Sequence, residues 1–226
     1  MRFLRFLSIS FLCCALLVPF LFCFVQIKTA ALPQTPAPTV PAPGTSAKAM
    51  ALFDATSGNF LAESGAAARL PMASTTKIMT ALVVLEECQP DDAFAVPAEA
   101  VGVEGSSVYL FEGEIVSVRT LLYALLLSSA NDAAVALALH TAGSVPAFAE
   151  KMNARAAALG LRDTCFQNPH GLPAEGHYTT ARELALIAAA AMKNPAFREI
   201  ASTTRYSVPQ NGTDATRLFL NHNRLL

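Results

Sequence analysis

Positive charge is scarce in this sequence of 226 residues, in which 16 Lys and Arg stand against 17 Asp and Glu. Three of the basic residues (Arg2, Arg5 and Lys28) lie within residues 1–31, which contain no acidic residue. The remaining residues therefore carry 13 basic and 17 acidic side chains, a net charge of −4. A protein that binds the phosphate backbone of a nucleic acid needs a basic surface. This balance excludes nucleic acid as the main partner.

Cysteine is scarce after residue 31, in the part of the sequence that is expected to fold. Three of the five cysteines (Cys13, Cys14 and Cys23) fall within residues 1–31, which leaves only Cys88 and Cys165. The spacing of these two does not indicate a disulfide, and we predict two buried free thiols. No His or Cys pair has the spacing of metal ligands. The sequence therefore predicts no metal site and no cofactor.

The first 47 residues are predicted to lie outside the fold. Arg2, Arg5 and the apolar run over residues 6–25 are typical of an export signal. Two interpretations stay open: a signal peptide over residues 1–31 that is cleaved, and an N-terminal anchor in the cytoplasmic membrane. Both place the rest of the chain outside the cytoplasm, secreted or tethered to the outer face of that membrane. Residues 32–47, with five of the 14 prolines, predict an extended Pro/Ala/Thr-rich tether.

Residues 48–226 are long enough for one domain with its own core. Short apolar runs around a Ser-, Gly- and Asn-rich turn predict a β-hairpin over residues 49–63, and a strong 3.6-residue period predicts a helix over 71–87. Residues 91–114 show no periodicity. The remaining pattern predicts helices over 118–127, 132–142, 144–159 and 180–193, and a strand over 204–208. Ser144 is the expected N-cap of the third of these helices, and Thr180 and Glu183 are expected to form a capping box at the start of the fourth. We therefore expect an α/β fold in which an antiparallel sheet is flanked by helices and carries an inserted all-helical lobe.

Ser74 and Lys77 stand three residues apart at the start of the strongest predicted helix. Residues at this spacing share a helix face, so the Lys77 amine can reach the Ser74 hydroxyl. A neutral amine can act as the base for the serine if burial lowers its pKa by about three units. Taken alone the pattern is weak, because a polar first turn with a solvated lysine has the same spacing.

Ser129 and Asn131 stand in the predicted break between two helices, 55 residues after Ser74. A hydroxyl and a carboxamide on one turn suit proton relay and recognition of a peptide backbone. Ser and Asn are also common at helix junctions for structural reasons. The two motifs together, in this order and with apolar flanks, indicate an active-site serine acyl transferase.

Five segments resemble a known family. Residues 71–80 (Pro-Met-Ala-Ser-Thr-Thr-Lys-Ile-Met-Thr) resemble the nucleophile helix of the low-molecular-weight penicillin-binding proteins. Residues 125–134 (Leu-Leu-Leu-Ser-Ser-Ala-Asn-Asp-Ala-Ala) resemble their second motif. Residues 105–110, 168–172 and 177–181 resemble further family segments in the right order.

The whole predicted domain is thus similar to serine-type D-alanyl-D-alanine carboxypeptidases of the DD-peptidase and β-lactamase-like fold. The resemblance implies removal of the terminal D-alanine from peptidoglycan stem peptides that end in D-Ala-D-Ala, during cell-wall biogenesis, and covalent capture by β-lactams. It implies that Ser74 is the nucleophile, Lys77 its general base and Ser129 a proton relay. Asn131 would be a ligand for the substrate amide and for Lys77. His170 and His177 are predicted to make structural hydrogen bonds rather than to act as bases.

One family motif is missing from the sequence. No Lys-Thr-Gly occurs after Asn131, and the last lysine is Lys193. In the family this motif lies on a strand that supplies an oxyanion N–H and a cation. We expect either a piece of a longer protein, with its C-terminal strands incomplete, or an inactive wall-binding relative. A serine β-lactamase is a further alternative, although the second motif reads Ser-Ala-Asn rather than Ser-Asp-Asn.

Overall fold

The computed structural model describes residues 44–210, 215–223 and 226, and it confirms the α/β class with a helical lobe. The helices longer than one turn are α2 (Thr76–Glu87), α3 (Val118–Leu127), α4 (Asn131–Ala142), α5 (Val145–Ala158), α6 (Ala181–Ala191) and α7 (Pro195–Ala201). The strands are β1 (Met50–Asp54), β2 (Asn59–Ser64), β3 (Ala93–Ala95), β4 (Ile115–Ser117), β5 (Arg205–Pro209) and β6 (Thr216–Leu220). In the described part the strands pair as three antiparallel two-stranded sheets, β1–β2, β3–β4 and β5–β6.

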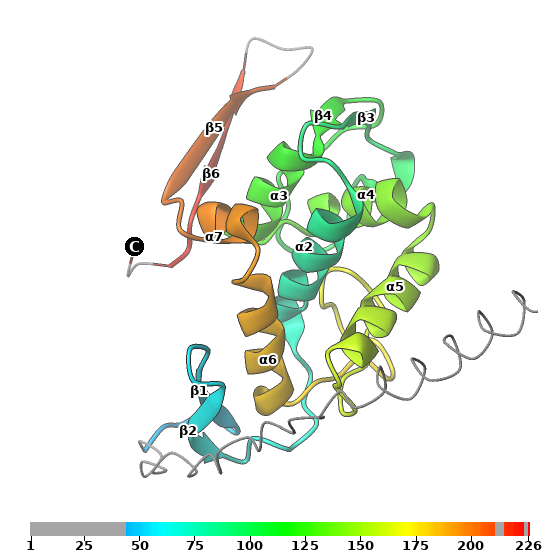
Figure 1. Ribbon diagram of the computed structural model, residues 1–226. Coiled ribbons are helices and arrows are strands. Elements are labelled where there is room, and N and C mark those ends of the chain that lie inside the picture. The colour runs from blue at the N-terminus through cyan, green and yellow to red at the C-terminus, as the bar shows by residue number, and fades with distance from the viewer. Residues whose placement is uncertain (1–43, 211–214, 224–225) are drawn as a thin grey trace, which may run out of the picture. The chain divides into compact units, whose positions relative to one another are not determined.

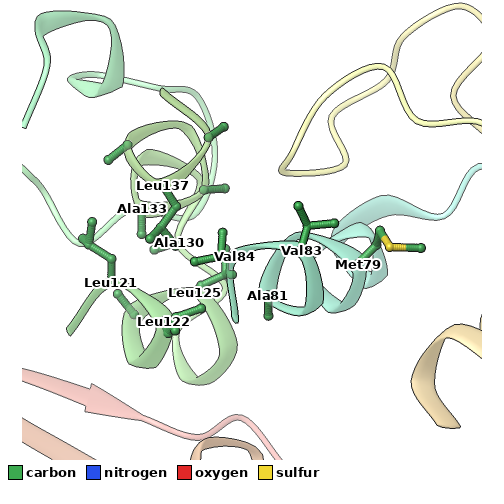
Figure 2. Close-up of a cluster of buried hydrophobic side chains, with 14 of the residues drawn as sticks. Met79, Ala81, Val83, Val84, Leu121, Leu122, Leu125, Ala130, Ala133 and Leu137 are labelled. Carbon is green, nitrogen blue, oxygen red and sulfur yellow. The ribbon is translucent and has the colours of Figure 1, made fainter. Parts of the chain in front are cut away.

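Helix α2 lies at the centre of the described helices and contacts α3, α4, α5, α6 and α7 (Figure 1). A helix that is apolar on nearly all sides is stable only when it is surrounded in this way. Met79 and Val84 on α2 are fully buried, as are Leu121 on α3 and Leu137 on α4 (Figure 2). Each large apolar side chain buried there contributes about 1.5–3 kcal/mol to folding. The start of α2 is thus anchored by the main core.

The N-terminal end of α2 differs from the expected helix over residues 71–87. A 3₁₀ turn, η2 (Ala73–Thr75), precedes the α-helix, which begins at Thr76. Ala73 adopts φ 45°, in the left-handed region. The Thr75 N–H donates to the Met72 carbonyl at 3.2 Å, a three-residue bond that tightens the chain here. The predicted nucleophile therefore stands on a strained turn before the helix rather than on its first turn.

The β1–β2 hairpin forms where it was predicted. The Asp54 carboxylate closes the turn, accepting hydrogen bonds from the Thr56 N–H at 2.9 Å and the Ser57 hydroxyl at 2.6 Å. Helix α6 packs against β1, and Arg182 of α6 lies over the Phe60 ring and pairs with Glu63. These contacts fix the hairpin to the helical core.

The structure contains elements that the sequence pattern did not predict. Residues 91–114, which lack periodicity, contain β3 and the one-turn 3₁₀ helix η3 (Ala98–Ala100), and β3 pairs with β4. Three-residue strands are too short to show a two-residue period. Helix α7 follows α6 as a separate element, with Asn194 as its N-cap and Pro195 at its first position. The strand expected over 204–208 is β5, and β6 returns beside it.

The predicted helix caps are present. The Ser144 hydroxyl accepts the Ala147 N–H at the start of α5, and the Thr180 hydroxyl accepts the Glu183 N–H at the start of α6. The Glu183 carboxylate does not return to Thr180 as a capping box requires, because it accepts the Arg162 and Asp163 N–H groups instead. Glu183 therefore ties the loop after α5 to α6.

Cys88 and Cys165 are free and partly buried, which confirms the prediction of unpaired thiols. The predicted signal or anchor, and all but the last few residues of the predicted tether, lie outside the described residues. Among the helices of the described ranges, none combines the length and apolar character needed to cross a membrane.

A buried ion pair fastens the β5–β6 hairpin to the rest of the fold. Arg217 on β6 pairs with Glu114, which precedes β4, and their side chains are 9% and 1% exposed. The same guanidinium also lies 3.4 Å from the Tyr109 carbonyl. Because both charged groups are shielded from water, each relies on the opposite charge of the other to offset its lost hydration.

We predict that Arg217→Met destabilises the protein by about 3–5 kcal/mol, since it leaves the Glu114 carboxylate buried without a counter-charge. Adding Glu114→Gln should recover a large part of that loss. Arg119→Met is the matched control, because the Arg119–Asp91 pair is 40% and 85% exposed and such pairs contribute under about 1 kcal/mol. Urea unfolding measures all three. Equal losses for Arg217→Met and Arg119→Met would contradict this account.

Candidate active site

Ser74 and Lys77 come together as the three-residue spacing predicts. Ser74 lies on the η2 turn and Lys77 on the first turn of α2, and Lys77 Nζ is 3.1 Å from Ser74 Oγ. Nζ also donates a hydrogen bond to the His170 carbonyl at 2.8 Å. Two hydrogen-bonding partners on different segments thus hold the amine beside the hydroxyl.

The Lys77 side chain is buried, with 2% of the residue exposed. Burial lowers the pKa of the Lys77 amine from 10.5 to about 8, because the charged form loses its hydration. Among the described residues no carboxylate forms an ion pair with this amine. With such a pKa about a tenth of the amine is neutral at pH 7, several hundred times the fraction of an ordinary lysine. Ser74 and Lys77 therefore form a pair in which a neutral amine can act as the base for the serine hydroxyl.

Ser129 lies in the break between α3 and α4, as predicted, and adopts φ 55°. Left-handed backbone at a serine costs about 1–3 kcal/mol and is typical of sites where side-chain direction matters. Ser129 lines a cavity of about 290 Å³ together with Ser74 and Lys77. The three residues predicted to be catalytic, Ser74, Lys77 and Ser129, thus line the same cavity.

Asn131 is the first residue of α4 and lines a second cavity, of about 310 Å³, together with Ser74 and His170. Its side-chain Nδ2 donates to the Glu104 carbonyl at 2.6 Å. The expected contact of Asn131 with Lys77 is not among the hydrogen bonds of the described residues, where the Lys77 amine bonds Ser74 and the His170 carbonyl. Ser74 lines both cavities, one with Ser129 and one with Asn131.

The two histidines make the structural hydrogen bonds that the sequence predicted. His177 Nδ1 accepts the Gln167 N–H at 3.0 Å, so Nε2 carries the proton and faces Thr76 Oγ1 at 2.9 Å. His170 Nδ1 accepts the Leu172 N–H at 3.1 Å.

Both imidazoles are held in the neutral form. Burial lowers the pKa of His177. Burial, the Lys77 charge and His177 lower the pKa of His170 to about 4. In the described part neither ring is hydrogen-bonded to Ser74.

The loop that contains His170 also packs closely against the η2 turn that carries Ser74. Gly171 adopts φ +94°, and a Cβ at this position would lie 1.9 Å from the Ala73 carbonyl oxygen and 2.9 Å from Thr76 Oγ1. Only glycine permits this approach. Sequence reasoning missed the role of this loop, because the acceptor for Lys77 is a main-chain carbonyl with no side-chain signature. The Gly after His170 was the one available signal.

No group of three His, Cys, Asp or Glu side chains that could hold a metal ion occurs in the part of the chain that the structure describes.

The D-alanyl-D-alanine carboxypeptidase family, peptidase family S11, matches residues 36–226. The chain is 35% identical over 185 residues to D-alanyl-D-alanine carboxypeptidase DacF of Bacillus subtilis, covering 80% of this chain and 47% of the relative. It is 42% identical over 160 residues to DacC of Escherichia coli, covering 66% of this chain and 40% of the relative. The chain thus spans less than half the length of these two relatives.

Solved structures show the same relationship. A D-alanyl-D-alanine carboxypeptidase from Mycobacterium tuberculosis superposes with a TM-score of 0.78 at 34% identity, covering 84% of this chain and 72% of that one. A mutant of the Streptomyces K15 DD-transpeptidase gives a TM-score of 0.75 at 34% identity, covering 81% and 77%. The family model covers more than half of the chain, and both relatives are more than 30% identical to it. The chain belongs to the D-alanyl-D-alanine carboxypeptidase family of serine peptidases.

Proposed function

We propose that this chain carries the catalytic groups of a serine-type D-Ala-D-Ala carboxypeptidase, which removes the terminal D-alanine from peptidoglycan stem pentapeptides. The observation that carries the proposal is the buried Lys77 amine 3.1 Å from the Ser74 hydroxyl. Membership in the family supports the substrate class. The role is in cell-wall biogenesis and remodelling.

In the acylation step the neutral Lys77 amine takes the proton of Ser74 as Oγ attacks the carbonyl carbon of the penultimate D-alanine. The oxygen of that carbonyl becomes an anion, and backbone N–H groups of the turn before α2 bind it. The bond from carbon to the leaving nitrogen then breaks. Ser129 relays the proton from Lys77 to that nitrogen, and free D-alanine departs.

In the second step water hydrolyses the ester. The Lys77 amine takes a proton from the water as its oxygen attacks the ester carbon, and Ser74 Oγ regains a proton as it leaves. Asn131, which lines a cavity together with Ser74, binds the backbone amide of the stem peptide. A β-lactam acylates Ser74 in the same way, but its ring-opened leaving group stays attached.

The proposed substrate lies outside the cytoplasmic membrane, so the proposal includes export of the chain. The predicted signal or anchor over residues 1–31 would supply it. The protein is then secreted or held at the outer face of the cytoplasmic membrane.

A second candidate is a penicillin-binding wall module that does not turn over its substrate. Both candidates share the buried Lys77 amine beside the Ser74 hydroxyl, and they differ in whether the acyl-enzyme is hydrolysed. Acylation and release of D-alanine therefore have to be measured separately.

We expect a fluorescent penicillin to label the purified chain covalently and Ser74→Ala to abolish the label on a denaturing gel. Ser207→Ala is the matched control, because Ser207 is exposed on β5 and should label like the wild type. Release of D-alanine from a stem pentapeptide then separates the two candidates. Label without release favours the wall module, rapid turnover of nitrocefin favours a β-lactamase, and label on Ser74→Ala rules out this nucleophile.

We also expect the acylation rate to rise with pH and to level off above a midpoint near 8. The base is the neutral amine, whose fraction grows as the pH passes the pKa of Lys77, about 8. Lys77→Arg keeps a cation that cannot lose its proton and should lower the rate about 10²–10⁴-fold. Stopped-flow acylation between pH 6 and pH 10 measures the profile. A rate that is independent of pH over this range, or a midpoint at the usual histidine pKa, would contradict Lys77 as the base.

A further inference from the structure

Asn131 is held by main-chain groups of one nearby segment. Its Nδ2 donates to the Glu104 carbonyl at 2.6 Å, and its backbone N–H donates to the Ser106 carbonyl at 2.7 Å. We call residues 104–110 the clamp segment. With one Nδ2 hydrogen fixed on Glu104, the side-chain oxygen and the other Nδ2 hydrogen remain for the cavity beside Ser74.

Gly105 lies between these two acceptors and against the Asn131 amide. It adopts φ +90°, and a Cβ there would lie 2.7 Å from Asn131 Nδ2. Real Cβ atoms do not approach a heavy atom this closely, so any other residue has to displace the amide. Glycine at this position thus allows the clamp segment to touch Asn131.

Asp132 holds residues 107–110 of the clamp segment in place through hydrogen bonds. It is 1% exposed, and its carboxylate accepts hydrogen bonds from the Ser107 hydroxyl at 2.6 Å and from the Val108 and Leu110 N–H groups at 3.1 Å. The guanidinium of the buried Glu114–Arg217 pair lies at the far end of the segment, beside the Tyr109 carbonyl. Because these bonds hold residues 107–110, we expect a group added at Gly105 to displace the Asn131 amide, the end of a side chain, more readily than the backbone of the clamp segment.

We propose that Gly105 is a positioning residue that sets the direction of the Asn131 carboxamide toward bound substrate. The inference rests on the proposed function, in which Asn131 binds the peptide amide. It assigns the clamp segment to substrate alignment rather than to loop stability alone. A displacement of about 1 Å in such a group can cost about 10²-fold in rate.

Gly105→Ala tests the proposal, with Gly102→Ala as its matched control. Gly102 is on the same loop and has φ +71°, but a Cβ there has no atom within 4 Å. Both substitutions place a Cβ on a residue with positive φ, at a backbone cost of about 1–2 kcal/mol, and thermal melting checks that both variants are folded. Gly105→Ala should lower the rate of acylation by a fluorescent penicillin about 10–100-fold, whereas Gly102→Ala should acylate like the wild type. Equal rates for the two variants would overturn the proposal.

A double-mutant cycle shows whether the effect passes through Asn131. In an Asn131→Ala background the amide that a Cβ would meet is gone, so Gly105→Ala should lower the rate less than about twofold further. If Gly105→Ala lowers the rate by the same factor in both backgrounds, it acts elsewhere and the proposal is wrong.

A readout without turnover keeps this inference separate from the proposed function. The side-chain amide resonance of Asn131 in a ¹H–¹⁵N spectrum, assigned from its loss in Asn131→Ala, should shift in Gly105→Ala and stay in place in Gly102→Ala. If the wild type takes no penicillin label, the proposed function fails, while this shift still supports the positioning and its absence overturns it.

Discussion

The site depends on the buried Lys77 amine, which pairs with no carboxylate in the described part of the chain. Lys77 lies on the first turn of α2, the helix that contacts five other helices and the main core. That packing removes the amine from water, and the loss of hydration lowers its pKa. A carboxylate in place of the His170 carbonyl would hold the lysine in its charged form and remove the base. The neutral acceptor and the surrounding core are therefore both parts of the chemistry.

Two segments distant from Lys77 in the sequence shape the site, each through main-chain atoms. The loop with His170 supplies a carbonyl for Lys77, and Gly171 lets it approach the turn under Ser74. The clamp segment holds Asn131 in a similar way, with glycine at the point of contact. Two non-glycine residues at the site, Ala73 and Ser129, have positive φ. Such strain persists because the packed helices on both sides over-determine the backbone.

The sequence predicted the elements with a strong period and the contacts that follow from local spacing. The Ser74–Lys77 contact, the β1–β2 hairpin and the caps at Ser144 and Thr180 follow from residues a few positions apart. The Lys77–His170 and Asn131–Glu104 bonds join residues 93 and 27 positions apart through carbonyls that every residue type possesses. No side-chain pattern can indicate them. The three-residue strands β3 and β4 were missed because so short a strand has no visible period.

The pKa of the Lys77 amine is the quantity on which this account depends most. The chain has five lysines, so labelling them with ¹³C at the ε-carbon gives a spectrum that can be titrated residue by residue, with Lys77→Arg identifying the resonance. We predict that the Lys77 resonance titrates near pH 8, well below the ordinary lysine value of 10.5. If it titrated at that ordinary value instead, the amine would be charged at neutral pH and could not serve as the base for Ser74.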